Sequence, residues 1–171
     1  DAQVIICDYN YVFSPGIRKL FFSRTKSKLE NSMIVIDETH NLPDRITSYQ
    51  TKTITTSTLS RLIEQLQKFN EKNALPLLRS LWTALLNAGK GIASNDKQMM
   101  TREAFNDILA QESDYSIEDM IDVFETADEI LQTDERNDEQ ITLGRVISFL
   151  ELWDQGLDSH ARIISHEPDQ N

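Results

Sequence analysis

Residues 33–42 read MIVIDETHNL: four apolar residues, Met33–Ile36, run directly into the adjacent acids Asp37 and Glu38 and then into His40. An uninterrupted apolar run of this length, ended by polar residues, is typical of a strand buried on both faces of a parallel sheet. Such sheets bind ligands at the carboxyl ends of their strands. The stretch therefore predicts an interior strand with two carboxylates at its tip. A plainer interpretation is a strand followed by the N-cap of a helix.

The sequence upstream favours the first interpretation. Residues 1–13 read DAQVIICDYNYVF and contain a second apolar run, Val4–Ile6. Ser14 followed by Pro15 then predicts a helix that begins at Pro15. Strand, helix and strand in this order predict the βαβ unit of a parallel sheet. Residues 46–56, rich in Thr, Ile and Tyr, predict a further strand at an exposed sheet edge.

The spacing of the two acids matches the Walker B or DEAH-box motif of helicase ATPases. Together with residues 1–15 and with Asn41-Leu42 after it, this motif makes the chain resemble the archaeal-type XPD family of iron–sulfur DNA helicases in superfamily 2. The resemblance is strong over residues 1–62 and beyond them lies in the order and length of segments. Thr39 stands where Ala is commoner in that family.

The resemblance implies roles for three residues of this motif. Asp37 would hold the water shell of the Mg²⁺ that accompanies ATP, and Glu38 would polarise the water that attacks the γ-phosphate. His40 would couple the nucleotide state to the rest of the motor, although a histidine that bonds a backbone carbonyl at a strand end is the plainer alternative.

Five further residues are candidates for binding DNA. Tyr9, Asn10 and Tyr11 leave the first predicted strand at its carboxyl end, and the resemblance places them near the path of single-stranded DNA, where aromatic rings stack on bases. Arg18 and Lys19 would contact phosphates. The alternatives are core packing for one tyrosine and an ordinary solvated face for the two cations.

The apolar period becomes helical from residue 57 onward. Five helices are predicted: from Ser57 to Phe69, from Pro76 to Gly89, from about Thr101 to Leu109, from a capping box at Ser116 to Leu131, and across Ile141–Gln155. Five helices with one apolar face each predict a bundle. Residues 161–165 predict a short extended segment.

The expected organisation therefore has three parts and is predominantly α overall. Residues 1–56 are an α/β remnant of two or three strands from helicase motor domain 1. Residues 57–160 are a helical bundle that the resemblance identifies as the Arch domain, and residues 161–171 are a return strand and tail. The resemblance implies that the Arch encloses single-stranded DNA and presents a surface to repair or transcription-factor proteins.

The charge is unevenly distributed over a net of −11. Residues 1–60 carry seven basic against six acidic side chains, residues 61–100 carry six against three, and residues 101–171 carry four against 19. Because acidic residues repel phosphate, nucleic acid should meet the first hundred residues. A rival function is a protein-interaction module whose acidic bundle docks a basic partner, and the plainest interpretation is a set of solvated helix faces.

Phosphate-binding and cluster-binding motifs are missing. Gly89-Lys90-Gly91 fails as a phosphate loop, because Ala84 stands where the loop needs Gly and Gly91 where it needs Ser or Thr. The single cysteine, Cys7, predicts a buried thiol and cannot supply the four ligands of an iron–sulfur cluster. The ligands of that cluster would lie elsewhere in the parent protein.

We therefore expect a fragment of an ATP-dependent 5′-to-3′ DNA helicase that acts on single-stranded and forked duplex DNA in nucleotide excision repair. A DinG-like helicase outside repair is the alternative. The fragment alone should be inactive, because it lacks a phosphate-binding loop. No apolar run is long enough to cross a bilayer and no signal pattern begins the sequence, so an intracellular protein is expected, cytoplasmic in a prokaryote and nuclear in a eukaryote.

Overall fold

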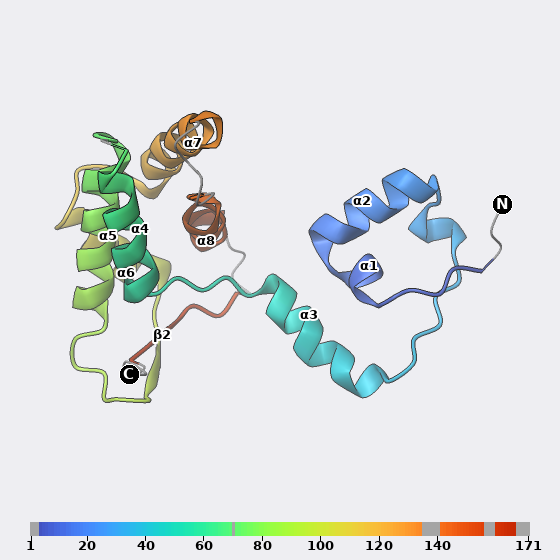
Figure 1. Cartoon of the computed structure of the whole chain (residues 1–171). Helices are drawn as coiled ribbons and strands as arrows, with labels where there is room; N and C mark the ends of the chain where they lie inside the picture. Colours follow the sequence, from blue (N-terminus) through green and yellow to red (C-terminus); the bar gives the residue numbers. More distant parts are fainter. Residues whose placement is uncertain (1–3, 70, 135–140, 156–159, 167–171) are drawn as a thin grey trace. The chain divides into compact units, whose positions relative to one another are not determined.

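The computed structural model describes residues 4–69, 71–134, 141–155 and 160–166. These residues are predominantly helical (Figure 1), as the sequence predicts. The chain divides into two compact units, Asp1–Lys52 and Thr53–Asn171, called here the first and second units.

The first unit contains three α-helices and two single-turn 3₁₀ helices. They are α1 (Asn10–Phe13), α2 (Pro15–Thr25), η1 (Leu29–Asn31), η2 (Thr39–Asn41) and α3 (Leu42–Gln50). Helix α2 begins at Pro15 as predicted, although the Ser14 side chain makes no capping hydrogen bond. It ends at Lys26, whose φ of 53° is left-handed. A left-handed residue there stops the helical hydrogen-bond pattern.

The strands predicted at Val4–Ile6 and Met33–Ile36 are not formed. Both segments lack regular secondary structure, and Ile6 is 95% exposed, Met33 94% and Val35 89%. A β-strand is held by hydrogen bonds to a neighbouring strand, and no described residue of the first unit supplies one. The predicted α/β character of this part of the chain is therefore wrong for the unit by itself.

The predicted edge strand at residues 46–56 is also wrong, because α3 occupies Leu42–Gln50. Two local features explain the helix: Pro43 lies in its first turn, where a missing N–H costs nothing, and Asp44 lies near the positive end of its dipole. β-Branched composition was thus a weaker determinant than the helix start.

The first unit has no buried side chain among residues 4–14 and 17–52, the residues whose burial the structure describes. Its aromatic contacts are Tyr11 with Phe21, with ring centroids 5.4 Å apart, and Phe21 with Phe22, at 5.3 Å. Cys7, predicted to be a buried thiol, is exposed, because the strand that would have buried it is not formed. The apolar residues of this unit therefore have little to pack on within it.

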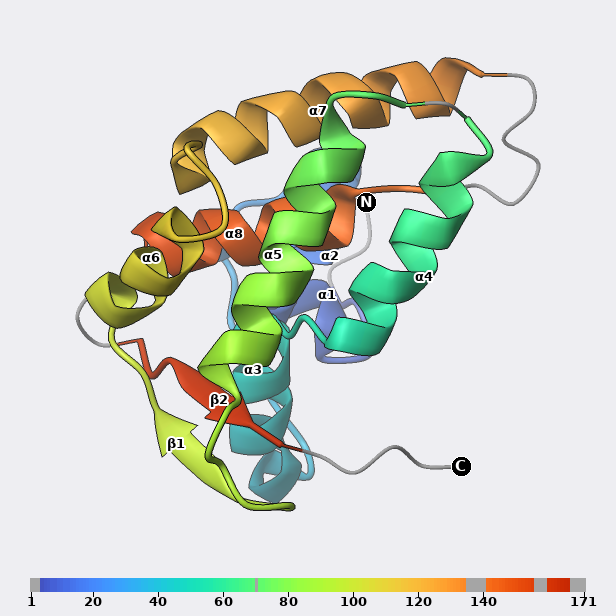
Figure 2. The same cartoon turned by 90° about the vertical axis from the view of Figure 1, so that its left-hand side faces the viewer.

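The second unit contains all five predicted helices. They are α4 (Thr56–Gln67), α5 (Ala74–Ala88), α6 (Arg102–Ala110), α7 (Ile117–Thr133) and α8 (Gly144–Gln155). Figure 2 shows α4 beside α5, and α5 also contacts α6 and α7 while α7 packs on α8. The buried core is built from the apolar faces of these helices.

Side-chain caps fix the beginnings of three of these helices. Ser116 forms a reciprocal capping box with Asp119 at α7, as the sequence predicts. Thr101 accepts a hydrogen bond from the Ala104 amide at α6, 3.1 Å long. Helix α4 is capped by Thr55 and begins at Thr56, one residue earlier than predicted.

Large apolar side chains fill the centre of the second unit. Phe105, Leu81 and Phe124 are at most 1% exposed. The Phe105 ring lies 4.9 Å from that of Trp153 at the end of α8. Burial of this kind, at about 25 cal/mol per Å² of apolar surface, is the main stabilising contribution to such a bundle.

A two-stranded antiparallel sheet joins distant parts of the second unit. Strand β1 (Lys97–Met99) pairs with β2 (Ile163–Ser165), so that Lys97 faces Ser165 and Met99 faces Ile163. The extended segment predicted at residues 161–165 is confirmed, whereas β1 lies between the second and third predicted helices, where no strand was predicted. The Met100 amide donates to the Arg162 carbonyl, 3.0 Å away, which continues the pairing. The predicted tail from residue 167 lies outside the described residues.

Candidate functional site

The acidic box, residues 37–40, is a tight turn. Glu38 has φ 52° and ψ 42°, a left-handed conformation, and its amide donates to Oδ1 of Asp37 at 2.9 Å. Few residues other than glycine adopt this conformation without strain. The turn carries the chain from the unpaired segment Met33–Ile36 into η2 and then α3.

The side chain of His40 lies between two neighbours. Its Nδ1 atom is 3.1 Å from Oε2 of Glu38, and its Nε2 atom is 3.0 Å from Nδ2, the side-chain amide nitrogen, of Asn41. The His40 and Glu38 side chains are 70% and 68% exposed. Asp37 is exposed as well. The described residues therefore place the box at an open surface, where His40 is the one described neighbour within 4 Å of the Glu38 carboxylate that can carry a positive charge.

The box does not form a metal site by itself. Among the described residues there is no group of three or more His, Cys, Asp or Glu side chains that could hold a metal ion. Mg²⁺ accepts one or two protein carboxylates when water and substrate phosphates supply its other ligands. Asp37 fits that limited part, as one exposed carboxylate, and only alongside groups from outside this chain.

The predicted DNA-binding residues lie on two adjoining helices. Tyr9 precedes α1, which carries Asn10 and Tyr11, and α1 packs on α2, which carries Arg18 and Lys19. The structure thus brings both sets into one unit, although on helices and not at the end of a strand. Both cations are exposed and form no ion pair with a described side chain.

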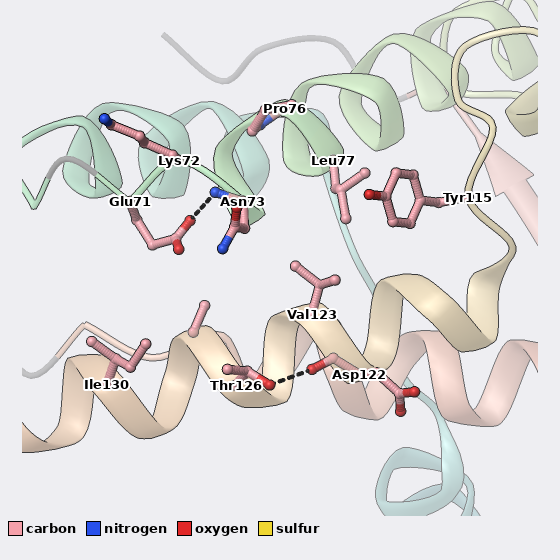
Figure 3. Close-up of a pocket in the computed structure, with 11 residues that line it drawn as sticks. Glu71, Lys72, Asn73, Pro76, Leu77, Tyr115, Asp122, Val123, Thr126 and Ile130 are labelled. Atoms are coloured by element: carbon pink, nitrogen blue, oxygen red, sulfur yellow. Dashed lines mark hydrogen bonds between the residues drawn. The ribbon is translucent and has the colours of Figure 1, made fainter.

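The second unit has a surface hollow that the sequence did not predict. It has a volume of about 380 Å³ and lies between the start of α5 and the middle of α7, where Figure 3 shows the side chains around it. Ile130, an apolar residue of α7, is 55% exposed at its edge. The sequence feature that could have indicated this exposure is the adjacent pair Ile130-Leu131. Adjacent side chains on a helix point about 100° apart, so when Leu131 faces the core, Ile130 is turned away from it.

Comparison with known proteins finds similarity in the first part of the chain. Residues 1–74 match the family model DEAD_2. This segment resembles DNA helicases of superfamily 2. The helicase-like segment, residues 1–74, includes the acidic box and the whole first unit and ends at the start of α5.

Individual relatives support the same assignment. The chain is 34% identical over 67 residues to "Regulator of telomere elongation helicase 1 homolog" of Caenorhabditis elegans, a match covering 39% of this chain and 6% of that protein. It is 39% identical over 71 residues to "ATP-dependent DNA helicase CHL1" of Yarrowia lipolytica, covering 42% of this chain and 8% of that protein. The matched region therefore spans a small part of each relative.

The described helices were also compared in length and apolar character with membrane-spanning helices. None of those in residues 4–69, 71–134 and 141–155 is long and apolar enough to cross a bilayer.

Proposed function

We propose that residues 1–56 of the helicase-like segment belong to the first motor domain of an ATP-dependent DNA helicase of superfamily 2, and that the five-helix bundle, whose first helix lies near the end of that segment, is its Arch domain. In domain terms, residues 1–56 belong to the motor, residues 57–160 to the Arch, and residues 161–171 return the chain toward the motor. The parent protein would unwind duplex DNA with 5′-to-3′ polarity.

The observation that carries this proposal is the state of residues 33–38. A run of four apolar residues enters two acids inside a segment that matches a helicase family, yet Met33 is 94% exposed and Val35 89%. Soluble proteins rarely leave such runs uncovered. Neighbouring strands of a motor-domain sheet would bury these side chains and supply the missing hydrogen bonds.

Completion of the sheet would also give the acidic box its function. Asp37 would contact Mg²⁺ through water, Glu38 would orient the attacking water, and His40 would link the nucleotide to the DNA-binding parts. The magnesium ion supplies charge stabilisation at the transferred phosphoryl group. Removal of the Glu38 contact with His40, 3.1 Å long in this chain, would accompany assembly of the cleft.

Single-stranded and forked DNA are the proposed substrates. Tyr9, Asn10 and Tyr11 would contact bases, while Arg18 and Lys19 would contact phosphates. Nucleotide excision repair is the process that the XPD resemblance implies, and a helicase role outside repair is the alternative that the names of the relatives favour. An iron–sulfur cluster would be held by cysteines outside this chain, and the cell nucleus is the expected compartment if the source is a eukaryote.

The test uses the complete protein that contains this chain. ATP hydrolysis stimulated by single-stranded DNA, and unwinding of a forked duplex with a 5′ tail, are measured for the parent and for Glu38→Gln. We expect the variant to lose activity by at least about 100-fold, because the water is no longer oriented. Glu30→Gln, the same change at an exposed acid of η1, should retain parental activity. Equal activity of Glu38→Gln and the parent would contradict the proposal.

Protein docking by the second unit is a second candidate function. Helix α7 carries six acidic side chains and no basic one. This concentration of charge favours a basic protein partner over nucleic acid for that helix.

A further inference from the structure

The hollow between α5 and α7 is an apolar groove with one open side. Val123, Thr126 and Ile130 line it from α7, and Pro76 and Leu77 face them from the first turns of α5 (Figure 3). Tyr115, just before α7, closes one end. Leu77 is buried and forms part of the floor.

The apolar walls of the groove are incompletely covered. Ile130 is 55% exposed and Tyr115 50%. The core-facing stripe of α7 is complete without them, since Met120, Phe124 and Leu131 are fully buried on it. Ile130 lies outside that stripe and is largely exposed, whereas Val123, seven residues earlier on α7, is half-buried and packs against the edge of the core.

The rim of the groove is acidic. Glu71 is held in place because its Oε2 atom accepts hydrogen bonds from the amides of Asn73, at 2.8 Å, and Ala74, at 2.6 Å. Asp122 lies on the opposite wall, and Lys72 is the basic residue of the described lining.

Helix α7 carries further acidic side chains outside the lining of the groove. Glu118, Glu125 and Glu129 of α7 are exposed. None of them pairs with a cation among the described side chains. The groove therefore combines apolar walls with two acidic side chains and one basic side chain in its lining, on a helix that carries six acids and no basic residue.

We propose that this groove docks a short amphipathic helix of a partner protein, with two or three apolar side chains on one face and Lys or Arg on either side of them. The inference rests on the docking function proposed for the second unit and is independent of the helicase proposal. Val123 and Ile130 are seven residues apart, about 10 Å along α7. That length equals the span from i to i+7 on a docking helix, the usual spacing of its apolar anchors.

Charge decides between this occupant and others. Nucleic acid would bring phosphates to an acidic rim. A second copy of this chain carries a net charge of −11, so that two copies repel one another at long range. A helix with basic flanks gains attraction at the rim while its apolar face covers Ile130 and Val123.

The test titrates the full 171-residue chain with a designed helical peptide. The fluorescein-labelled peptide, about 16 residues long, carries Leu at positions i, i+4 and i+7 and Lys or Arg at the flanking positions. Its control has Ser in place of the three Leu and the same charge. Anisotropy gives the affinity, and amide chemical shifts locate the bound peptide. We expect the Leu peptide to shift residues 71–77 and 115–130, with binding that weakens as salt is added.

Variants of the chain separate groove binding from general attraction. Ile130→Ser should weaken binding of the Leu peptide by at least about tenfold. Ile163→Ser, at an isoleucine of β2 that is 54% exposed, should leave the affinity unchanged. Asp122→Asn should weaken it while Glu151→Gln, at an exposed acid of α8, should not. Unchanged melting temperatures of the variants establish that each is folded.

Four outcomes overturn the inference. Equal binding of the Leu and Ser peptides means that charge alone attracts them. Binding with shifts elsewhere on the second unit leaves the docking function but removes the groove. A concentration-dependent dimer that Ile130→Ser converts to monomer would assign the groove to a second copy of the chain. If neither peptide binds at about 1 mM, the weakest useful affinity, both the groove and the docking function are ruled out.

Discussion

The Nδ1 atom of His40 lies 3.1 Å from the Oε2 atom of Glu38, and the two side chains are 70% and 68% exposed. The acid proposed to orient the attacking water is thus paired with its own neighbour at an open surface. In an ATP-driven motor, the catalytic carboxylate must face the γ-phosphate of a bound nucleotide, so that it can orient the attacking water. In this chain the acidic box has the residues for that chemistry but not the surroundings.

The first prediction follows directly. The 171-residue chain by itself should release no phosphate from ATP above the background rate, because nothing in it holds the β- and γ-phosphates. A coupled phosphate-release assay with Mg²⁺ and single-stranded DNA measures this. Hydrolysis that disappears in Glu38→Gln would show that the chain forms a complete site.

The second prediction concerns the unequal packing of the two units. Leu81→Ala should destabilise the second unit by about 3 kcal/mol, because the side chain is fully buried and its loss leaves a cavity. Val35→Ala, at a residue 89% exposed, should change the unfolding free energy by less than about 0.5 kcal/mol. Urea unfolding followed by circular dichroism measures both. A large effect of Val35→Ala would mean that this side chain is covered in the isolated chain.

The third prediction concerns the start of α7. Ser116→Ala should cost about 1 kcal/mol of stability, because the Ser116 hydroxyl accepts the Asp119 amide at 3.1 Å and caps the helix. Thermal unfolding at neutral pH measures the loss. Ser113→Ala, at a serine just before the helix whose side chain does not cap it, is the matched control, although its hydroxyl accepts a bond from the Tyr115 amide.

The same capping box gives a pH dependence. Hydrogen bonds from the side chain and then from the backbone of Ser116 lower the pKa of Asp119 below its ordinary value. The charged form is therefore favoured by folding, so this contribution is present above the ordinary pKa of about 3.9 and is lost as the pH falls through the lowered value.

The measurement compares melting temperatures of the parent and Asp119→Asn. The parent should be the more stable at about pH 6, and the difference should shrink toward about pH 2.5. Asp122→Asn is the control, since the structure describes no hydrogen bond to the Asp122 carboxylate. A difference for Asp119→Asn that does not vary with pH would contradict the assignment.

The fifth prediction concerns the link between β2 and α8. Arg162 donates from Nε and Nη2 to the Trp153 carbonyl, at 3.2 Å and 2.9 Å, and its guanidinium carbon lies 5.6 Å from the centre of the Trp153 ring. Arg162→Ala should lose about 1–3 kcal/mol of local stability, because charged hydrogen bonds are removed. Faster hydrogen exchange at the Met100 amide, which donates to the Arg162 carbonyl, reports it. Arg79→Ala on the exposed face of α5 should leave that amide unchanged.

The sequence predicted the helices of the second unit well because their determinants are local. The capping box of Ser116 and Asp119 predicted the start of α7. The apolar spacing of Leu59, Leu62 and Leu66 predicted α4, and all three leucines are buried. Strands depend on partners distant in sequence, which a local pattern does not reveal. Met33–Ile36 therefore looked like a strand yet has no partner here, while β1 was missed because its partner, β2, lies more than 60 residues away.

The catalytic roles of the candidate site residues stay a prediction, and the geometry of the site was not predicted. Asp37, Glu38 and His40 were identified from their spacing, and their segment falls within a helicase family match. Their local arrangement, with Glu38 left-handed at φ 52°, depends on backbone conformations that spacing does not specify. The groove at Ile130 was missed because a single apolar residue beside a buried stripe is common on helices.

The central claim is that Met33–Ile36 becomes an interior strand when the complete protein is present. Hydrogen exchange at the amides of Ile34, Val35 and Ile36, compared between the 171-residue chain and the complete protein, tests it most directly. We predict fast exchange in the isolated chain and protection by at least about 1,000-fold in the complete protein, where ladder hydrogen bonds hold these amides. Equally fast exchange in both would contradict the account.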